Sequence, residues 1–240
     1  MRDTPRSSPP LRSSDTSRGP RKGRRLVVLS AGLSQPSSTR LLADQIAGAV
    51  DAEVSGRGEG IDIQTYELRE YAVDLATMMA TAGMPTARLD ELRRAVSAAD
   101  GLVVVTPVFA ASYSGVFKMF FDALDADALN GMPVIIAATA GTPRHSLMLD
   151  HALRPLLTYL RAVVMPTGVF AATEDFGGGA AGRDLAGRAA RAAAELAAHL
   201  VSTGGDAVAG FTPTRSGRDS GVDVPAEVTP FMKLLGGQAR

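Results

Sequence analysis

The body of the chain alternates between short apolar runs and longer amphipathic stretches. The apolar runs predict buried strands at residues 26–30, 61–66, 101–106, 133–139 and 162–169. Pro166 would break the last of these strands. Apolar residues recur at helical spacing over residues 37–50, 86–98, 114–124, 146–160 and 184–200. In the first of these stretches Leu42, Ile46 and Val50 repeat every four positions and would share one face of a helix.

This order of elements indicates one fold class. Strands that alternate with helices form a parallel sheet with helices on both faces, because the crossovers are right-handed. We therefore expect a doubly wound α/β domain with a five-stranded parallel sheet over residues 25–203. Residues 204–240 return to glycine, proline and charged residues, apart from an apolar patch at 231–235. We expect this C-terminal extension to dock on the body of the chain or on another subunit.

The charges are unevenly distributed, although 25 basic and 25 acidic residues balance overall. Residues 1–25 hold eight basic and two acidic residues, a charge of +6, and the remaining residues carry −6. The segment 1–24 is rich in Ser, Pro, Arg and Gly, which is typical of a disordered basic tail. It has no aromatic residue to stack on bases, so we interpret it as a solvated extension rather than a nucleic-acid-binding arm.

Several function classes are disfavoured by composition. No run of about 18 apolar residues is present, so we expect no membrane-spanning helix and no membrane partner. The chain has no cysteine, which excludes disulfides, thiolate metal sites and a cysteine nucleophile, and which fits a cytoplasmic location. Histidines and carboxylates do not occur at metal-ligand spacing, so we expect no metal site.

The loop after the first predicted strand is the strongest candidate for an anion site. Ligands of doubly wound sheets bind beyond the carboxyl ends of the strands. This loop opens a helix and carries Ser34, Ser37, Ser38, Thr39 and Arg40. Hydroxyls and free amides at a helix N-terminus bind phosphate, and an arginine adds charge. The alternative is simple helix capping by one of the serines. The GxxxxGK[ST] and GxGxxG motifs are absent, which disfavours the usual nucleotide-binding loops.

Two further loops would lie at the same edge of the sheet. The second, residues 106–115, contains Pro107 to fix a turn and Gly115 to allow close backbone approach. Its backbone amides would suit a flat heterocycle. The third, residues 139–146, would place Gly141 and Thr142 at the edge of the same ring. We interpret His145 as a residue that forms hydrogen bonds at a helix start rather than as a catalyst.

With these loops identified, two segments resemble flavodoxin-like NAD(P)H-dependent FMN reductases. ADGLVVVTPVFAASYSGVFK at 99–118 is similar to the central motif of that family. GTPRHSLMLDHALRP at 141–155 is similar to its helix after the fourth strand. The resemblance covers about residues 26–202. It is strongest to the reductases that supply reduced flavin to two-component monooxygenases of the alkanesulfonate and methanesulfonate type.

The resemblance implies a flavodoxin-like fold with an FMN site built from the three loops. The first loop would hold the FMN phosphate. The ring would lie against the second and third loops. The implied cofactor-binding residues are Ser34, Ser37, Ser38, Thr39, Arg40, Pro107, Val108, Phe109, Ala110, Tyr113, Ser114, Gly141 and Thr142. Phe109 stands where relatives commonly have tyrosine. His151 occupies the position of an inserted residue that widens the helix into a π-bulge at the tetramer interface of relatives.

The implied function is hydride transfer from NAD(P)H to FMN, with reduced flavin passed to a partner monooxygenase. The flavin would carry the chemistry, so no catalytic side chain is expected. One alternative keeps FMN bound and reduces a quinone, an azo dye or a metal oxyanion such as chromate. Another is a flavodoxin-like electron carrier, although such carriers are usually strongly acidic. We expect a homo-oligomer, either a dimer or a tetramer, and no nucleic-acid partner.

Overall fold

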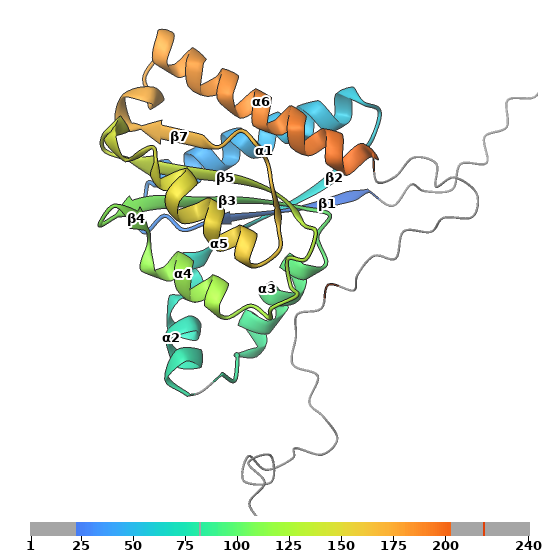
Figure 1. Ribbon diagram of the computed structural model, residues 1–240, viewed down its shortest axis with the longest axis vertical. Coiled ribbons are helices and arrows are strands. Elements are labelled where there is room, and N and C mark those ends of the chain that lie inside the picture. The colour runs from blue at the N-terminus through green and yellow to red at the C-terminus, as the bar shows by residue number, and fades with distance from the viewer. Residues whose placement is uncertain (1–22, 82, 203–217, 219–240) are drawn as a thin grey trace, which may run out of the picture.

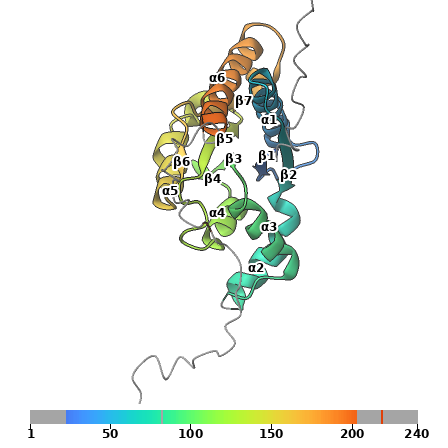
Figure 2. The same cartoon turned by 90° about the vertical axis from the view of Figure 1, so that its right-hand side faces the viewer.

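The computed structural model describes residues 23–81, 83–202 and 218. Their arrangement confirms the predicted α/β class, with a parallel sheet in the order β2-β1-β3-β5-β6 (Figure 1, and Figure 2 for β6). This is the strand order of flavodoxin-like folds. The strands are β1 (Arg24–Ser30), β2 (Ile61–Glu67), β3 (Gly101–Phe109), β4 (Ser112–Tyr113), β5 (Pro133–Ala140), β6 (Val163–Val164) and β7 (Val169–Ala172).

The fifth position of the sheet is filled by two short strands. β6 pairs with the start of β5, through Pro133 and Val163, and β7 pairs with its end, through Ala137 and Val169. Pro166 lies in the gap between them, as expected of a residue that cannot donate to a ladder. The predicted break is therefore confirmed, but the strand continues to Ala172 rather than ending at Val169.

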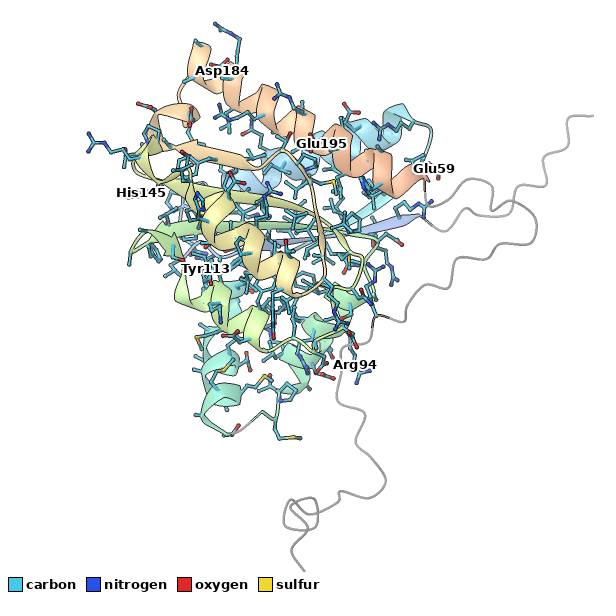
Figure 3. All side chains as sticks on the ribbon, in the orientation of Figure 1. Glu59, Arg94, Tyr113, His145, Asp184 and Glu195 are labelled. Carbon is cyan, nitrogen blue, oxygen red and sulfur yellow. The ribbon has the colours of Figure 1, made fainter. Side chains whose placement is uncertain are left out.

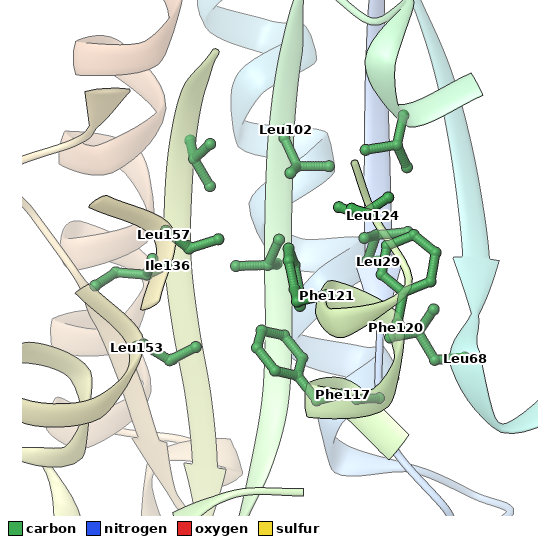
Figure 4. Close-up of a cluster of buried hydrophobic side chains, with 14 of the residues drawn as sticks. Leu29, Leu68, Leu102, Phe117, Phe120, Phe121, Leu124, Ile136, Leu153 and Leu157 are labelled. Atoms are coloured by element: carbon green, nitrogen blue, oxygen red, sulfur yellow. The ribbon is translucent and has the colours of Figure 1, made fainter. Parts of the chain in front are cut away.

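Helices cover both faces of the sheet (Figures 1 and 2). One face carries α1 (Ser38–Gly56) and α6 (Ala180–Ser202). The other face carries α3 (Ala87–Ser97), α4 (Gly115–Asp122) and α5 (Arg154–Tyr159). Alternate residues of β1 pack into the two cores, with Leu26 and Val28 on the side of α1 and Leu29 on the side of α4. Figure 4 shows the second core, where three phenylalanines of α4 pack against the sheet.

Several elements differ from the sequence prediction. A 3₁₀ turn (Leu68–Tyr71) and α2 (Ala72–Ala80) were not expected, because α2 buries only Leu75 and therefore shows little helical periodicity. The predicted loop 106–115 is largely an extension of β3 and its return as β4. The predicted helix 146–160 is divided into a π-helix (Leu149–Leu153) and α5.

The first strand lies close to the predicted start of the domain. β1 begins at Arg24, one residue before the predicted limit of 25, and its backbone N–H donates to the Gly60 carbonyl at 3.1 Å. The predictions for residues 1–22 and for the extension 204–240, including the patch at 231–235, lie outside the described residues, apart from residue 218. Over the described ranges, no helix combines the length and the apolar character needed to cross a membrane.

Candidate functional site

The loops that follow β1, β3, β5 and β7 meet around a hollow of about 360 Å³, which we call the smaller hollow because a larger one adjoins it. It lies at the carboxyl edge of the sheet, the end at which Figure 3 labels His145. The three loops singled out in the sequence therefore come together in space. The lining consists of Leu33, Ser34, Ser38, Thr39, Pro107, Val108, Phe109, Thr139, Ala140, Gly141 and Thr173.

A larger hollow of about 760 Å³ adjoins the smaller one. The two share Ser34, Ser38, Ala140 and Thr173, so they form one continuous depression. The larger hollow is further lined by Gln35, Pro36, Ser37, Arg40, Leu41, Asp44, Glu67, Arg69 and Phe176. Charged side chains thus gather in the larger hollow, whereas the smaller one is lined by hydroxyls, backbone and apolar groups.

The first loop divides its hydroxyls between capping and an open site. Ser37 is the N-cap of α1, and its hydroxyl accepts a hydrogen bond from the backbone N–H of Arg40 at 3.2 Å. Ser34 and Ser38 line both hollows, and within the described residues their hydroxyls have no hydrogen-bond partner. The first amides of α1 also lack helical acceptors. Capping and anion binding are therefore both available, on different serines.

A glycine allows the first loop to fold back over the helix start. A Cβ at Gly32 would lie 2.0 Å from the Ser37 Oγ and 3.1 Å from the Thr39 Cβ. Real Cβ atoms do not approach other atoms so closely, so glycine is required for this packing. The loop that presents Ser34 and Ser38 thus depends on this one position.

Thr39 has a structural contact that the sequence did not indicate. Its side chain is buried, and its Oγ1 lies 2.8 Å from the Oγ1 of Thr139, at the end of β5. The Thr39 hydroxyl is therefore engaged with Thr139 at the start of the third loop, although Thr39 still lines the smaller hollow. The pair joins the first and third loops beneath the site.

Arg40 is held by carboxylates of the same chain. Its Nε lies 2.8 Å from Asp44 and its Nη1 lies 3.0 Å from Glu67. The hydrogen bond to Asp44 raises the pKa of the Arg40 guanidinium above its ordinary value. Arg40 lines only the larger hollow, and its charge is offset by two neighbours. It offers an anion less net positive charge than the sequence alone suggests.

The second loop is a tight hairpin with an aromatic tip. Phe109 pairs with Ser112, and the two connecting residues, Ala110 and Ala111, have φ angles of +48° and +62°. Two successive left-handed residues are the geometry of a type I′ turn, which usually contains glycine or asparagine. Phe109 is 47% exposed at the rim of the smaller hollow. The hairpin therefore presents an open aromatic face beside Pro107 and its neighbours.

Four expected contact residues are not among the described residues that line the smaller or the larger hollow. Ser114 is fully buried, where its hydroxyl caps α4 by accepting from the Phe117 N–H at 3.4 Å. Thr142 caps the 3₁₀ turn Pro143–His145 in the same way, and Ala110 lies in the hairpin turn. Tyr113 faces a third hollow, of about 640 Å³, between α4 and α5. None of these four belongs to the lining of the smaller hollow among the described residues.

The π-bulge expected at His151 is confirmed. Residues Leu149–Leu153 form a π-helix that leads directly into α5. His151 lines the third hollow together with Tyr113, Lys118 and Tyr159. Hydrogen bonding to Asp122 raises the pKa of Lys118 above its ordinary value. The bulge thus places a histidine on the outer surface between α4 and α5, away from the smaller hollow.

Sequence reasoning missed several lining residues. Thr173 and Phe176 follow β7, and they were overlooked because the predicted strand ended too early at 169. Glu67 is the last residue of β2 and Arg69 lies in the 3₁₀ turn after it; both were overlooked because only three loops were considered. Their signal was available, since β2 was predicted and its carboxyl end had to reach the same edge of the sheet.

Comparison with known proteins places these features in context. A model of the NADPH-dependent FMN reductase family matches residues 24–177. An FMN reductase (NADPH) of Pseudomonas aeruginosa is 40% identical over 152 residues, which are 63% of this chain and 78% of that protein. The NADH-dependent FMN reductase SfnF of Pseudomonas fluorescens is 38% identical over 179 residues, which are 75% of this chain and 92% of that protein. The X-ray structure of an oxidoreductase from Corynebacterium diphtheriae is 63% identical, with a TM-score of 0.73, and the match covers 75% of this chain and 98% of that one.

Proposed function

The chain belongs to the NADPH-dependent FMN reductase family, and we propose that it reduces FMN as an exchanging substrate and supplies the product to a separate flavin-dependent monooxygenase. Membership makes it an oxidoreductase that uses FMN and NAD(P)H, which confirms the reaction class and cofactors expected from the sequence. The convergence of the loops after β1, β3 and β5 around the smaller hollow supports the proposal most directly.

The residues around the smaller hollow fit a flavin phosphate and ring. The Ser34 and Ser38 hydroxyls and the first amides of α1 are donors suited to a phosphate. Pro107 and Phe109 supply apolar and aromatic surface for a planar ring. A Cβ built at Gly141 would meet nothing within 4 Å, so the backbone of the third loop is accessible from the hollow. The donor set and the apolar surface thus match the two halves of FMN.

The protein's own contribution is binding and orientation. FMN, when bound, accepts a hydride from the nicotinamide and thereby supplies the chemistry. The backbone at Gly141 can offer an N–H to the negative charge that reduction adds. The described lining of the smaller hollow contains no titratable side chain, so the role of these residues in the proposal is to bind and orient the flavin.

The charge balance beside the first loop supports exchange of the flavin. Arg40 is already paired with Asp44 and Glu67, and Arg69 is paired with Glu67 at 2.6 Å. Arginines compensated in this way attract a phosphate less than free ones would. A moderate hold on the phosphate is what a reductase needs if its product is to leave for a second enzyme.

The test is NAD(P)H oxidation by the purified, dialysed protein with and without added FMN. We expect oxidation to require added FMN and to produce reduced flavin that a flavin-dependent monooxygenase can use. Retention of stoichiometric FMN through dialysis, with rapid reduction of a quinone or azo dye, would instead favour the alternative reductase function. No NAD(P)H oxidation under any of these conditions would contradict both.

We further propose that the protein is a homo-oligomer, a dimer or tetramer, which associates through the surface between α4 and α5. Tyr159 on this surface is 83% exposed, and it lines the third hollow with His151 and Leu156. A large exposed aromatic beside an apolar groove is typical of an interaction surface. The π-helix at His151 supports the choice of this region as the association surface, because such bulges concentrate at functional sites.

A cytoplasmic location is proposed as well. It is supported by the absence of cysteine from the chain and by the use of NAD(P)H. Fractionation of the source cells tests it, with the protein expected in the same fraction as cytoplasmic NAD(P)H-dependent enzymes. Recovery from the envelope or the medium would contradict it.

A further inference from the structure

Glu67, at the end of β2, stands between two arginines at the wall of the larger hollow. Its Oε1 lies 3.0 Å from the Nη1 of Arg40, and its Oε2 lies 2.6 Å from the Nε of Arg69. The side chains of Glu67 and Arg69 are only 16% and 18% exposed. The two arginines come from different elements, α1 and the 3₁₀ turn after β2. One carboxylate therefore accepts a hydrogen bond from Arg40 and forms a close ion pair with Arg69.

Arg69 also reaches the first loop. Its Nη1 lies 3.5 Å from the backbone carbonyl oxygen of Ser34. With the oxygen of the Gln35 amide facing the guanidinium, that oxygen accepts from the Nη1 at 3.0 Å. Ser34 and Gln35 belong to the first loop, in which Ser34 and Ser38 line both hollows. Arg69 thus connects the end of β2 to the first loop, which we call the phosphate loop from here on.

We propose that Arg69, oriented by Glu67, is a positioning residue for the phosphate loop and sets the preference for FMN over riboflavin. This rests on the proposed function, in which FMN is a substrate. The fork of a guanidinium can hold Glu67 and the loop at the same time, which fixes the loop relative to the sheet. A fixed loop keeps its hydroxyls and amides directed at a phosphate before the flavin arrives.

The contacts indicate that Arg69 acts through the loop. Its charge is balanced by Glu67, and its contacts to the loop are to a carbonyl oxygen and an amide oxygen, not to the serine hydroxyls. Arg69 lines the larger hollow and does not line the smaller one, where the flavin ring is expected. Its loss should therefore affect the phosphate-bearing flavin and leave the ring site intact.

The experiment compares FMN with riboflavin, which has the same ring and no phosphate, in Arg69→Met. We expect kcat/KM for FMN relative to riboflavin to fall about tenfold, the size of one lost charge-assisted hydrogen bond. The fall should come from KM for FMN, with kcat and the KM for riboflavin unchanged. Quenching of flavin fluorescence gives the Kd of both flavins independently of turnover, and the ratio of Kd values should change by the same factor.

Arg57→Met is the matched control. Arg57 also joins a glutamate and a backbone carbonyl, with its Nη2 3.5 Å from Glu53 and 3.1 Å from the Ala194 oxygen. It lies just after the C-terminal end of α1, far along the helix from the first loop. We expect it to leave the FMN-to-riboflavin ratio at the wild-type value. An equal fall in both arginine variants would show a general structural effect and overturn the proposal.

Arg69→Lys separates positioning from charge. A lysine keeps the positive charge but cannot hold Glu67 and the loop together, so we expect it to lose most of the preference for FMN. Full retention of the preference by Arg69→Lys, or an unchanged ratio in Arg69→Met, would overturn the proposal. Failure of the proposed function would be distinguishable from failure of this proposal, because it would appear as an absence of FMN reduction in the wild type. The ratio of the Kd values for FMN and riboflavin would still test the role of Arg69 in that case.

Discussion

At the scale of single residues, two buried hydroxyls hold the candidate flavin site together. Thr39 and Thr139 lie 100 positions apart in sequence, yet their Oγ1 atoms are 2.8 Å apart and both side chains are buried. Each hydroxyl is a hydrogen-bond partner of the other, and both residues expose very little surface, which makes the pair sensitive to the loss of one partner. The phosphate loop and the third loop are thereby held at a fixed separation.

Thr139→Val should destabilise the protein and weaken FMN binding. The change keeps the shape of the side chain but leaves the Thr39 hydroxyl buried and unpaired, at a cost of about 1–3 kcal/mol in the free energy of unfolding. Thermal unfolding and the KM for FMN measure the two effects. The double variant Thr39→Val with Thr139→Val removes both hydroxyls and should recover most of the stability. Equal stability of wild type and Thr139→Val would contradict the role of the pair.

Ala111→Gly should stabilise the protein. Ala111 has a φ of +62° in the turn between β3 and β4, where an L side chain is strained and glycine is not. We expect a gain of about 1 kcal/mol in the free energy of unfolding, seen as a higher Tm. Ala190→Gly, at an exposed helical position of α6, is the control and should lose about 1 kcal/mol. A loss of stability in both variants would contradict the strain at Ala111.

At the scale of elements, the irregular segments carry the features that distinguish this chain from a generic doubly wound domain. The π-helix Leu149–Leu153 interrupts what periodicity alone presents as one continuous helix. It moves His151 into the hollow between α4 and α5, where Tyr159 is also exposed. This surface, rather than the sheet edge, is the one we assign to association between subunits.

Tyr159→Ser should weaken subunit association and leave the fold intact. The ring has little contact with its own chain, so its loss should cost little stability in a monomer. Light scattering at micromolar concentration measures the mass, and the variant should be smaller than the wild type. Val73→Ser replaces another exposed apolar residue, on α2, and should not change the mass. A monomeric wild type would contradict the proposed association.

Regular elements could be predicted from the sequence, and irregular ones mostly could not. β1 was found as a short, continuous apolar run, and α1 was found from apolar residues that recur at helical spacing. α2 escaped because it buries only Leu75, and the β3–β4 hairpin escaped because its turn uses two alanines in place of glycine. The π-helix was anticipated only through resemblance to a family. Contacts across the fold, such as Thr39 with Thr139 and Arg40 with Glu67, depend on tertiary packing and leave no local pattern.

At the scale of the whole molecule, the balanced charge hides two parts of opposite sign. Residues 1–25 carry +6 and the remainder carries −6. The first strand of the described body, β1, begins at Arg24, and the described body supplies the lining residues named above for both hollows. The reductase activity should therefore belong to this body.

Deletion of residues 1–22 should leave FMN reduction unchanged. The deletion retains Arg24 and its hydrogen bond to the Gly60 carbonyl, so β1 can pair with β2 as before. Steady-state kcat and KM for FMN, measured at two ionic strengths, compare the deletion with the full chain. Loss of activity at either ionic strength would show that the basic segment takes part in the reaction.

The central claim is that the protein treats FMN as a substrate that it binds, reduces and releases. Initial rates of NAD(P)H oxidation, measured while both NAD(P)H and FMN are varied, test this most directly. We predict saturation by FMN and intersecting double-reciprocal lines, because both substrates must be present together around the smaller hollow. Parallel lines with a quinone or azo acceptor, at a rate independent of added FMN, would contradict the claim and identify a reductase that keeps its flavin.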